Sequence, residues 1–152
     1  MSAVNLGLPN ALSNKAAPRR GEVPCSAQAE YALLGCVLVD DFEVWGELEM
    51  YSLEAEDFFY PENKAIWRAF RWLYDQGMEV TTASTAFALE RIGMIDAVDK
   101  WLAPTSSTEP YLAELWGACF SAKGSGAFIR MVKHYSDMRA PLSHSKWEIE
   151  ID

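Results

Sequence analysis

The stretch from Pro61 to Gly77 constrains the fold of this chain more than any other. Pro61 suits the first position of a helix, because its missing N–H would be unpaired there in any case. Gly77 suits the stop at the other end, since glycine readily adopts the left-handed conformation that ends many helices. Between them, apolar residues fall at i, i+1, i+4, i+7 and i+8, namely Ile66, Trp67, Phe70, Leu73 and Tyr74. This spacing predicts an amphipathic helix whose apolar stripe is far more typical of a packed core than of a cofactor site.

Helix signals on both sides of this stretch predict an all-α fold. Ser26 suits the N-cap of a first helix, whose apolar face consists of Tyr31, Leu34, Val37 and Leu38. Asp40 and Glu43 form a capping-box-like start for a second helix. Ser84 is expected to cap a later helix that stops at a glycine, and a shorter helix is expected over residues 96–102.

Two more helices are predicted after a turn-rich break at residues 104–110. Apolar residues repeat at helical spacing in the first, which are Leu112, Leu115, Trp116, Cys119 and Phe120. In the second they are Phe128, Met131, Val132, Tyr135 and Met138. A short glycine-containing turn joins the two, so we expect an αα-hairpin that ends at Pro141. Ile129 widens the second apolar face beyond what one partner helix usually covers.

The chain is therefore expected to have four regions. Residues 1–23 form a flexible arm, residues 24–104 a compact multi-helix bundle, residues 105–140 the helical hairpin, and residues 141–152 an acidic and apolar tail. In the tail Trp147, Ile149 and Ile151 alternate with acidic residues, which is strand-like periodicity. Such a strip suits addition to the edge of a partner's sheet, and a disordered terminus is the alternative. We find no signal peptide and no apolar run long enough for a membrane span.

The charge of the chain opposes direct binding to DNA. The 152 residues carry a formal net charge of −9, and residues 40–62 hold nine acids and no Lys or Arg. These acids are expected mainly to solvate helix faces. Nucleic-acid affinity comes largely from neutralising phosphates. A DNA-binding protein would have to rely on the few basic residues of the last helix, which are Lys123, Arg130, Lys133 and Arg139.

Motifs that carry catalysis are missing from the sequence. It has no G-x-x-x-x-G-K-[ST] phosphate loop, and its two histidines, His134 and His144, lie ten residues apart. No two of its three cysteines have C-x-x-C spacing, so neither a zinc site nor a disulfide framework is expected, as suits a reducing cytoplasm. We therefore predict a protein that is not an enzyme and needs no cofactor or metal. A small helical enzyme with an unrecognised carboxylate pair is the alternative.

Six motifs in a fixed order resemble the N-terminal domain of the DnaB-family replicative DNA helicases. Residues 24–35 resemble the family's P-x-S-x-E-A-E and L-G. Residues 57–67 resemble D-F-Y…H-x-x-I-F, residues 73–77 resemble L-Y-x-x-G, and residues 80–93 resemble P-V-D-x-x-T-x-x-x-x-L-x-x-x-G. Residues 111–115 read Y-L-A-E-L as in the family, and Phe128 with Met131 and Val132 falls at its Y-x-x-I-V.

The chain departs from the family pattern at several places. Cys25 stands where the family often has His, Gln28 replaces Glu, and Thr81 replaces Asp. The family's hairpin turn contains Thr-Pro, whereas Cys119 and Phe120 stand there in this chain, so the hairpin tip is expected to differ. The family's RecA-like ATPase domain and its linker helix are missing.

The resemblance implies a helical subdomain followed by a long hairpin. In the family such domains pair through their hairpins into a collar that docks primase and loader proteins. We therefore expect a cytoplasmic interaction module of DNA replication that binds helicase, primase or loader, or forms homo-oligomers. Its expected contact residues are Leu112, Leu115, Trp116, Phe120, Phe128, Met131, Val132 and Tyr135 on the hairpin, and Trp147, Ile149 and Ile151 in the tail.

Two other interpretations remain open. In the first, the chain is an N-terminal fragment of a replicative helicase. In the second, it is a small helical regulator unrelated to replication. The Met1 start and the acidic tail argue mildly against a fragment, since the family continues into a longer linker.

Overall fold

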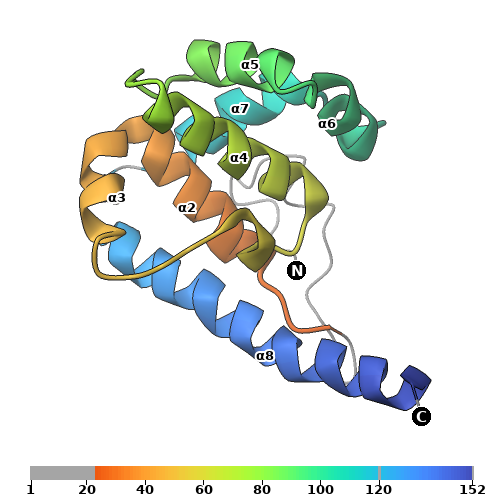
Figure 1. Ribbon diagram of the computed structural model, residues 1–152. Helices are drawn as coiled ribbons and strands as arrows, with labels where there is room; N and C mark the ends of the chain where they lie inside the picture. Colours follow the sequence, from red (N-terminus) through yellow and green to blue (C-terminus); the bar gives the residue numbers. More distant parts are fainter. Residues whose placement is uncertain (1–22, 120, 152) are drawn as a thin grey trace, which may run out of the picture.

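The computed structural model describes residues 23–119 and 121–151, with side chains as far as Ala140, and these ranges contain helices and no strand (Figure 1). This confirms the prediction of an all-α fold. The helices are α2 (Ala27–Val39), α3 (Asp41–Glu47), η2 (Ala55–Asp57), α4 (Pro61–Asp75), α5 (Thr82–Arg91), α6 (Ile95–Leu102), α7 (Thr108–Gly117), η3 (Ala122–Gly124) and α8 (Ser125–Ile151).

Most helix ends follow the local signals of the sequence. The Ser26 side chain accepts a hydrogen bond from the backbone N–H of Ala29, at 3.1 Å, and so caps α2. Pro61 is the first residue of α4, and Gly77 after it has a φ of 71°. The prediction for Ser84 was wrong, because Thr81 is the N-cap of α5 and Ser84 is the third helical residue. The two side chains cap each other's backbone N–H groups in a capping box, so the helix begins one turn earlier than expected.

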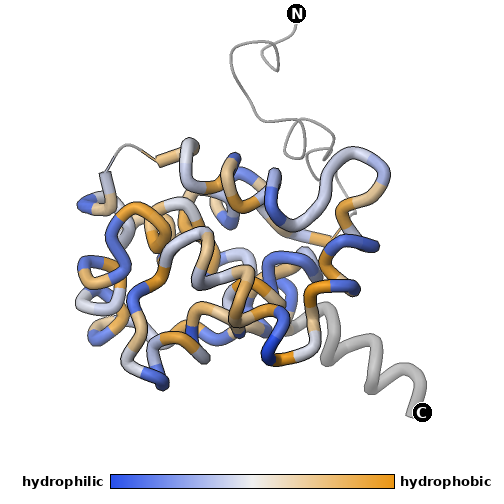
Figure 2. The backbone as a smooth tube through the Cα atoms, turned by 90° about the horizontal axis from the view of Figure 1, so that it is seen from above, coloured by the Kyte–Doolittle hydropathy of each residue, from blue (hydrophilic) through white to orange (hydrophobic). Residues whose placement is uncertain are grey.

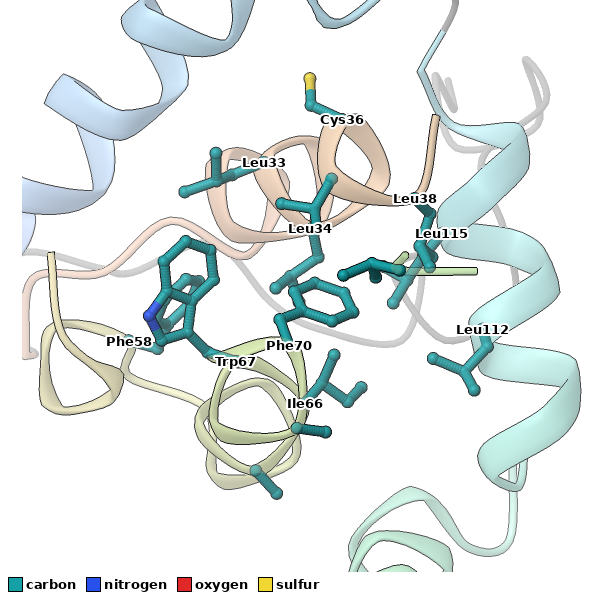
Figure 3. Close-up of a cluster of buried hydrophobic side chains, with 14 of the residues drawn as sticks. Leu33, Leu34, Cys36, Leu38, Phe58, Ile66, Trp67, Phe70, Leu112 and Leu115 are labelled. Atoms are coloured by element: carbon teal, nitrogen blue, oxygen red, sulfur yellow. The ribbon is translucent and has the colours of Figure 1, made fainter. Parts of the chain in front are cut away.

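Helix α2 lies at the centre of the core. Its residues from Ala29 to Leu38 are buried except for Ala32, so it lacks the single apolar stripe that the sequence pattern suggested. A helix that is apolar nearly all round is typical of a position surrounded by other helices. Helices α3, α4, α7 and α8 all contact it. Figure 3 shows the apolar side chains that meet between α2, α4 and α7, which include Leu33, Leu34, Phe58, Ile66, Trp67, Phe70, Leu112 and Leu115.

The outer helices are amphipathic. Along the chain, hydrophobic and hydrophilic stretches alternate within single helices (Figure 2). In α4 the stripe expected from the sequence is confirmed, with Ile66, Trp67, Phe70 and Leu73 fully buried. Tyr74, by contrast, is 49% exposed, because it lies at the edge of the stripe and faces Arg71 and Trp45.

The two helices expected as a hairpin, α7 and α8, both pack mainly on α2, which lies between them in Figure 1. Helix α7 also contacts α5 and α6, whereas α8 also contacts α3 and η2. Their connection contains the short helix η3, where a simple glycine turn was expected. The apolar faces of α7 and α8 therefore cover the central helix more than they cover each other.

The C-terminal segment differs from the expectation. Helix α8 continues through Pro141 to Ile151, so the strand-like interpretation of the tail and the stop at Pro141 were both wrong. Alternation over six residues is too short to decide between strand and helix when a helix already precedes it. The predicted arm at residues 1–23 lies almost wholly outside the described residues. The side chains of Trp147, Ile149 and Ile151 also lie outside them, so their predicted contacts are not tested.

Candidate protein-interaction surface

The inner side of α8 is built into the bundle. Ser125, Ile129 and Val132 are almost completely buried, at 0%, 0% and 2% exposure. Their spacing of four and three residues places them on one face of the helix. The sequence suggested that Ile129 widens the apolar face beyond what one partner helix covers, and in the structure it is one of the residues that hold α8 on the core.

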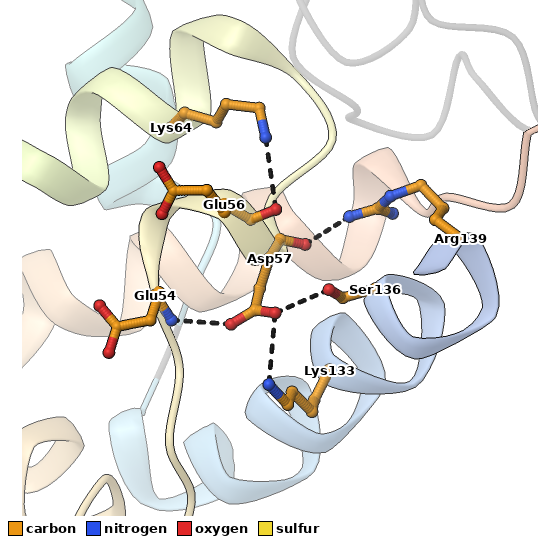
Figure 4. A network of polar contacts seen from close by, with 7 residues as sticks. All are labelled: Glu54, Glu56, Asp57, Lys64, Lys133, Ser136 and Arg139. Carbon is orange, nitrogen blue, oxygen red and sulfur yellow. Dashed lines mark hydrogen bonds and ion pairs between the residues drawn. The ribbon is translucent and has the colours of Figure 1, made fainter. Parts of the chain in front are cut away.

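A polar cluster around Asp57 fastens α8 to η2 (Figure 4). The carboxylate of Asp57 accepts hydrogen bonds from the Ser136 hydroxyl at 2.6 Å and from the backbone N–H of Glu54 at 2.7 Å. The Lys133 ammonium lies 3.3 Å from the same carboxylate. Burial raises the pKa of Asp57, but these hydrogen bonds and the Lys133 charge outweigh it and hold the pKa below its usual value. Asp57 is therefore a charged anchor for α8.

Arg139 completes this attachment. Its guanidinium donates hydrogen bonds to the backbone carbonyls of Asp57, at 2.6 Å, and of Pro24, at 3.1 Å. It also lies 5.5 Å from the centroid of the Phe59 ring. One side chain of α8 thus joins two segments that lie far from it in sequence. We call the contacts of Lys133, Ser136 and Arg139 with Asp57 and Pro24 the α8 clamp.

A second polar network is buried at the centre of the bundle. Glu30 is 2% exposed and accepts hydrogen bonds from the backbone N–H of Phe59, at 2.7 Å, and from the amide of Asn63, at 2.9 Å. Tyr111 in turn donates to the amide oxygen of Asn63 at 2.6 Å. Burial raises the pKa of Glu30 despite these hydrogen bonds. This network connects α2, α4 and α7, so its acid has a structural role.

The outer side of α8 faces solvent. Its exposed residues recur with helical spacing, and we call this set the outer α8 stripe: Ala127, Arg130, Met131, His134, Asp137 and Met138. Met131 and Met138 are each 43% exposed. They are seven residues apart, which is two helical turns, so they lie on the same side of the helix. Because the clamp holds the opposite side, the stripe is presented on a fixed support.

The structure separates the predicted contact residues into three groups: core, half-buried and exposed. Leu112, Leu115 and Val132 are core residues with at most 2% exposure, and Phe128 and Tyr135 are half-buried. Trp116 and Met131 are exposed, at 58% and 43%. Phe120 lies outside the described residues. The predicted set is therefore brought together around α2 in part only, and its exposed members are the ones available to a partner.

Two strongly exposed apolar residues were missed by the sequence interpretation. Phe42 is 84% exposed on α3, and Met50 is 78% exposed after it. Both lie among acidic residues, and an apolar side chain flanked by acids such as Asp41 and Glu43 is a signal that could have indicated exposure.

The described residues show little that suits catalysis. A hollow of about 600 Å³ lies beside α4, with Arg68, Arg71, Glu54 and Asp75 in its lining and without a histidine or cysteine there. Arg68 pairs with Glu56 at 2.8 Å, and the Arg71 guanidinium lies over the rings of Trp45 and Tyr74. Within the described part of the chain no three His, Cys, Asp or Glu residues come together as metal ligands. Over the same part, no helix has the length and apolar character needed to cross a membrane.

The fold and this surface define a small all-helical domain with a clamped C-terminal helix. The family model described as the DnaB-like helicase N terminal domain matches residues 22–134, which is well over half of the chain. The chain therefore belongs to the family of DnaB-like helicase N-terminal domains. The 152 residues contain no ATPase domain.

Comparison with solved structures supports the same fold. The crystal structure of the N-terminal domain of DnaB helicase from Mycobacterium tuberculosis matches with a TM-score of 0.72 and 22% sequence identity. The match covers 85% of this chain and 85% of that chain. Identity this low shows likeness of fold alone. No curated protein sequence matches this chain.

Proposed function

We propose that this chain is a non-catalytic protein-interaction module of DNA replication. It binds the replicative helicase, the primase or a helicase loader, or it assembles with copies of itself. Membership of the family supports the connection to replication. A role beside the helicase would place the chain in the cytoplasm.

The outer α8 stripe is the observation that carries this proposal. Met131 and Met138 expose apolar area on a helix whose inner side is already covered by the core. Methionine adapts its shape to different partners and is common on binding surfaces. The α8 clamp holds the helix in place, so a partner need not order it on binding. Trp116, at the end of α7, is a further exposed aromatic residue of the kind that dominates binding energy at interfaces.

The absence of sequence motifs supports a role without catalysis. A phosphate loop provides the backbone amides and lysine that hold nucleotide phosphates, and the sequence lacks one. We therefore expect the purified protein to hydrolyse no ATP and to unwind no DNA.

The proposal is tested by light scattering and by binding to purified partners. Wild type at high micromolar concentration should form dimers or larger species, or else bind the helicase, primase or loader of its host. The double variant Met131→Glu/Met138→Glu should lose that association while keeping its helical circular dichroism, because both side chains are partly exposed. Phe42→Glu is the matched control, since Phe42 is more exposed than either methionine and lies on α3.

The outcomes distinguish the alternatives. A wild type that is monomeric and binds none of the three partners contradicts the proposal and favours a helical regulator unrelated to replication. Association that survives in the methionine variant places the interface elsewhere on the molecule. Loss of association in the Phe42 control as well would show a general charge effect.

A further inference from the structure

Two cysteines from distant parts of the sequence meet in the structure. Cys36 lies on α2, and Cys119 follows the end of α7, yet their Sγ atoms are 3.0 Å apart. The Cys119 thiol also donates a hydrogen bond to the carbonyl of Ser121 at 3.1 Å. Since each thiol has one proton, Cys36 is the donor in the contact between the two sulfurs.

The backbone brings these two residues close. Gly35, the neighbour of Cys36, lies so near to α7 that a Cβ atom there would collide with the carbonyl oxygen of Leu115 and would lie 3.4 Å from the Cβ of Cys119. Gly35 therefore allows α2 and α7 to approach closely, and the two cysteines lie next to this contact. A disulfide bond requires an Sγ–Sγ distance of about 2.05 Å, so the sulfurs need to approach by roughly 1 Å.

We propose that Cys36 and Cys119 form a redox modification site, at which a low-molecular-weight disulfide oxidises the two thiols to an intramolecular disulfide. This inference does not depend on the proposed function. It concerns the connection between α7 and α8, which the disulfide would tie to the central helix α2.

The two thiols have different parts in the reaction. Cys119 is half-buried and meets the reagent first, whereas Cys36 is fully buried. Burial, and then its hydrogen bond to Cys119, raises the pKa of the Cys36 thiol, which disfavours its thiolate and its attack on a reagent in solution. Cys36 therefore reacts second, within the protein, where its sulfur already lies 3.0 Å from that of Cys119.

The exchange conserves atoms and electrons. The Cys119 sulfur gives up its proton and attacks one sulfur of the reagent, whose S–S bond breaks and releases one reagent thiol. The Cys36 sulfur then gives up its proton and attacks Cys119 Sγ, which releases the second reagent thiol. Two protein thiols are oxidised, and one reagent disulfide is reduced to two thiols.

Cys25 provides an internal control. It is buried just before the first turn of α2, whereas Cys36 lies in the last turn, and the Cys25 Sγ lies 3.7 Å from the hydroxyl of Tyr60. Oxidation of the site should therefore leave the Cys25 thiol unchanged.

The test uses the whole chain incubated with oxidised glutathione. The reduced protein has three thiols, and we expect only one to remain after the incubation when free thiols are counted in the unfolded protein. The intact mass should fall by two hydrogen atoms. Peptide mapping should show Cys36 linked to Cys119, and dithiothreitol should restore all three thiols. The melting temperature of the oxidised protein should rise by about 5 °C or more, because the bond closes a long loop in the unfolded chain.

Variants make each result decisive. Cys25→Ser should lose both of its remaining thiols, as the wild type loses two. Cys36→Ser should instead keep a glutathione adduct on Cys119. The proposal is overturned if the wild type retains three thiols, if it stops at a glutathione adduct, or if Cys25 is one of the linked residues. Should Cys36→Ser fail to fold, the wild type and Cys25→Ser alone still decide the outcome.

Discussion

Gly35 shows how a single missing side chain sets the distance between two helices. Its position on α2 leaves no room for a methyl group, because the carbonyl oxygen of Leu115 on α7 occupies that place. The residue has an ordinary helical conformation, so its requirement for glycine comes from packing and not from backbone dihedrals. A sequence pattern alone does not distinguish this glycine from one that merely tolerates replacement.

Substitution of Gly35 by alanine should destabilise the protein. A Cβ at this position forces α2 and α7 apart, and overpacking of this kind typically costs about 1–3 kcal/mol. Gly46→Ala is the matched control, because a Cβ there meets nothing within 4 Å and alanine favours the helix by up to about 1 kcal/mol. Urea unfolding of both variants measures the difference. A Gly35→Ala protein as stable as the control would disprove the close packing.

Asp57 is the second residue whose surroundings determine its role. Its pKa is lower in the folded protein than in the unfolded chain, so its charge stabilises the fold above the unfolded value of about 3.9. That stabilisation is lost as the pH falls through the still lower folded value. The pKa of Glu30 is raised, so the contribution of Glu30 to stability has the opposite dependence on pH. This contribution is the same in wild type and in an Asp57 variant, so it cancels when the two are compared.

Replacement of Asp57 by asparagine should make this dependence visible. At pH 7 we expect a loss of about 2 kcal/mol, because charged hydrogen bonds to Ser136 and Lys133 are replaced by weaker ones. The difference between wild type and variant should shrink as the pH falls below about 4 and through the lowered pKa of Asp57, where the wild-type carboxyl also becomes neutral. Urea unfolding at several pH values provides the measurement. A difference that stays constant over that range would show that the charge of Asp57 is not the cause.

At the scale of the helices, apolar burial and polar contacts determine different aspects of the position of α8. Apolar packing of Ile129 and Val132 fixes which side of α8 faces the core. The α8 clamp fixes its position along the helix axis, since hydrogen bonds depend on distance and direction more than apolar contacts do. The apolar and the polar residues of α8 therefore contribute in different ways to the docking of one helix.

Arg139→Ala should loosen α8 while leaving the rest of the bundle folded. The variant removes the hydrogen bonds to the carbonyls of Asp57 and Pro24, which we expect to cost about 2 kcal/mol. Hydrogen exchange of backbone amides at residues 133–140 should become faster, and exchange in α4 should change much less. Arg130→Ala is the control, because Arg130 is exposed on the outer stripe. Equal protection of α8 in both variants would contradict the clamp.

At the scale of the whole molecule, charge and fold together oppose binding to DNA. The acidic residues outnumber the basic ones by 22 to 13. Of the basic residues on or beside α8 whose side chains the structure describes, Lys133 and Arg139 are already engaged in the clamp. Arg130 and Lys123 are exposed but too few to offset the net charge of −9.

We therefore expect negligible affinity for double-stranded DNA at physiological ionic strength. A gel-shift or anisotropy titration in about 150 mM salt, where exposed charges are screened within about 8 Å, should show no complex at sub-micromolar protein. Clear binding under these conditions would contradict the expectation. If Arg130→Ala then abolished this binding, the outer α8 stripe would be the DNA-binding surface.

The sequence by itself determined the helical class and most helix ends. The signals at Ser26, Asp40, Pro61 and Gly77 act through hydrogen bonds and backbone angles within a few residues, so they can be interpreted without knowledge of the rest of the chain. The same local logic explains the miss at Ser84, because Thr81 and Ser84 are both good capping residues and differ only in which of them begins the helix.

For the late helices, only the tertiary structure decided which apolar residues are buried and which side of each helix remains free. Leu112 and Trp116 have the same periodicity in the sequence, yet one is in the core and the other is exposed. The positions of α7 and α8 on α2, the clamp at Asp57 and the meeting of Cys36 with Cys119 all join residues that are distant along the chain. Such contacts depend on how complete helices pack against one another, and no local pattern contains that information.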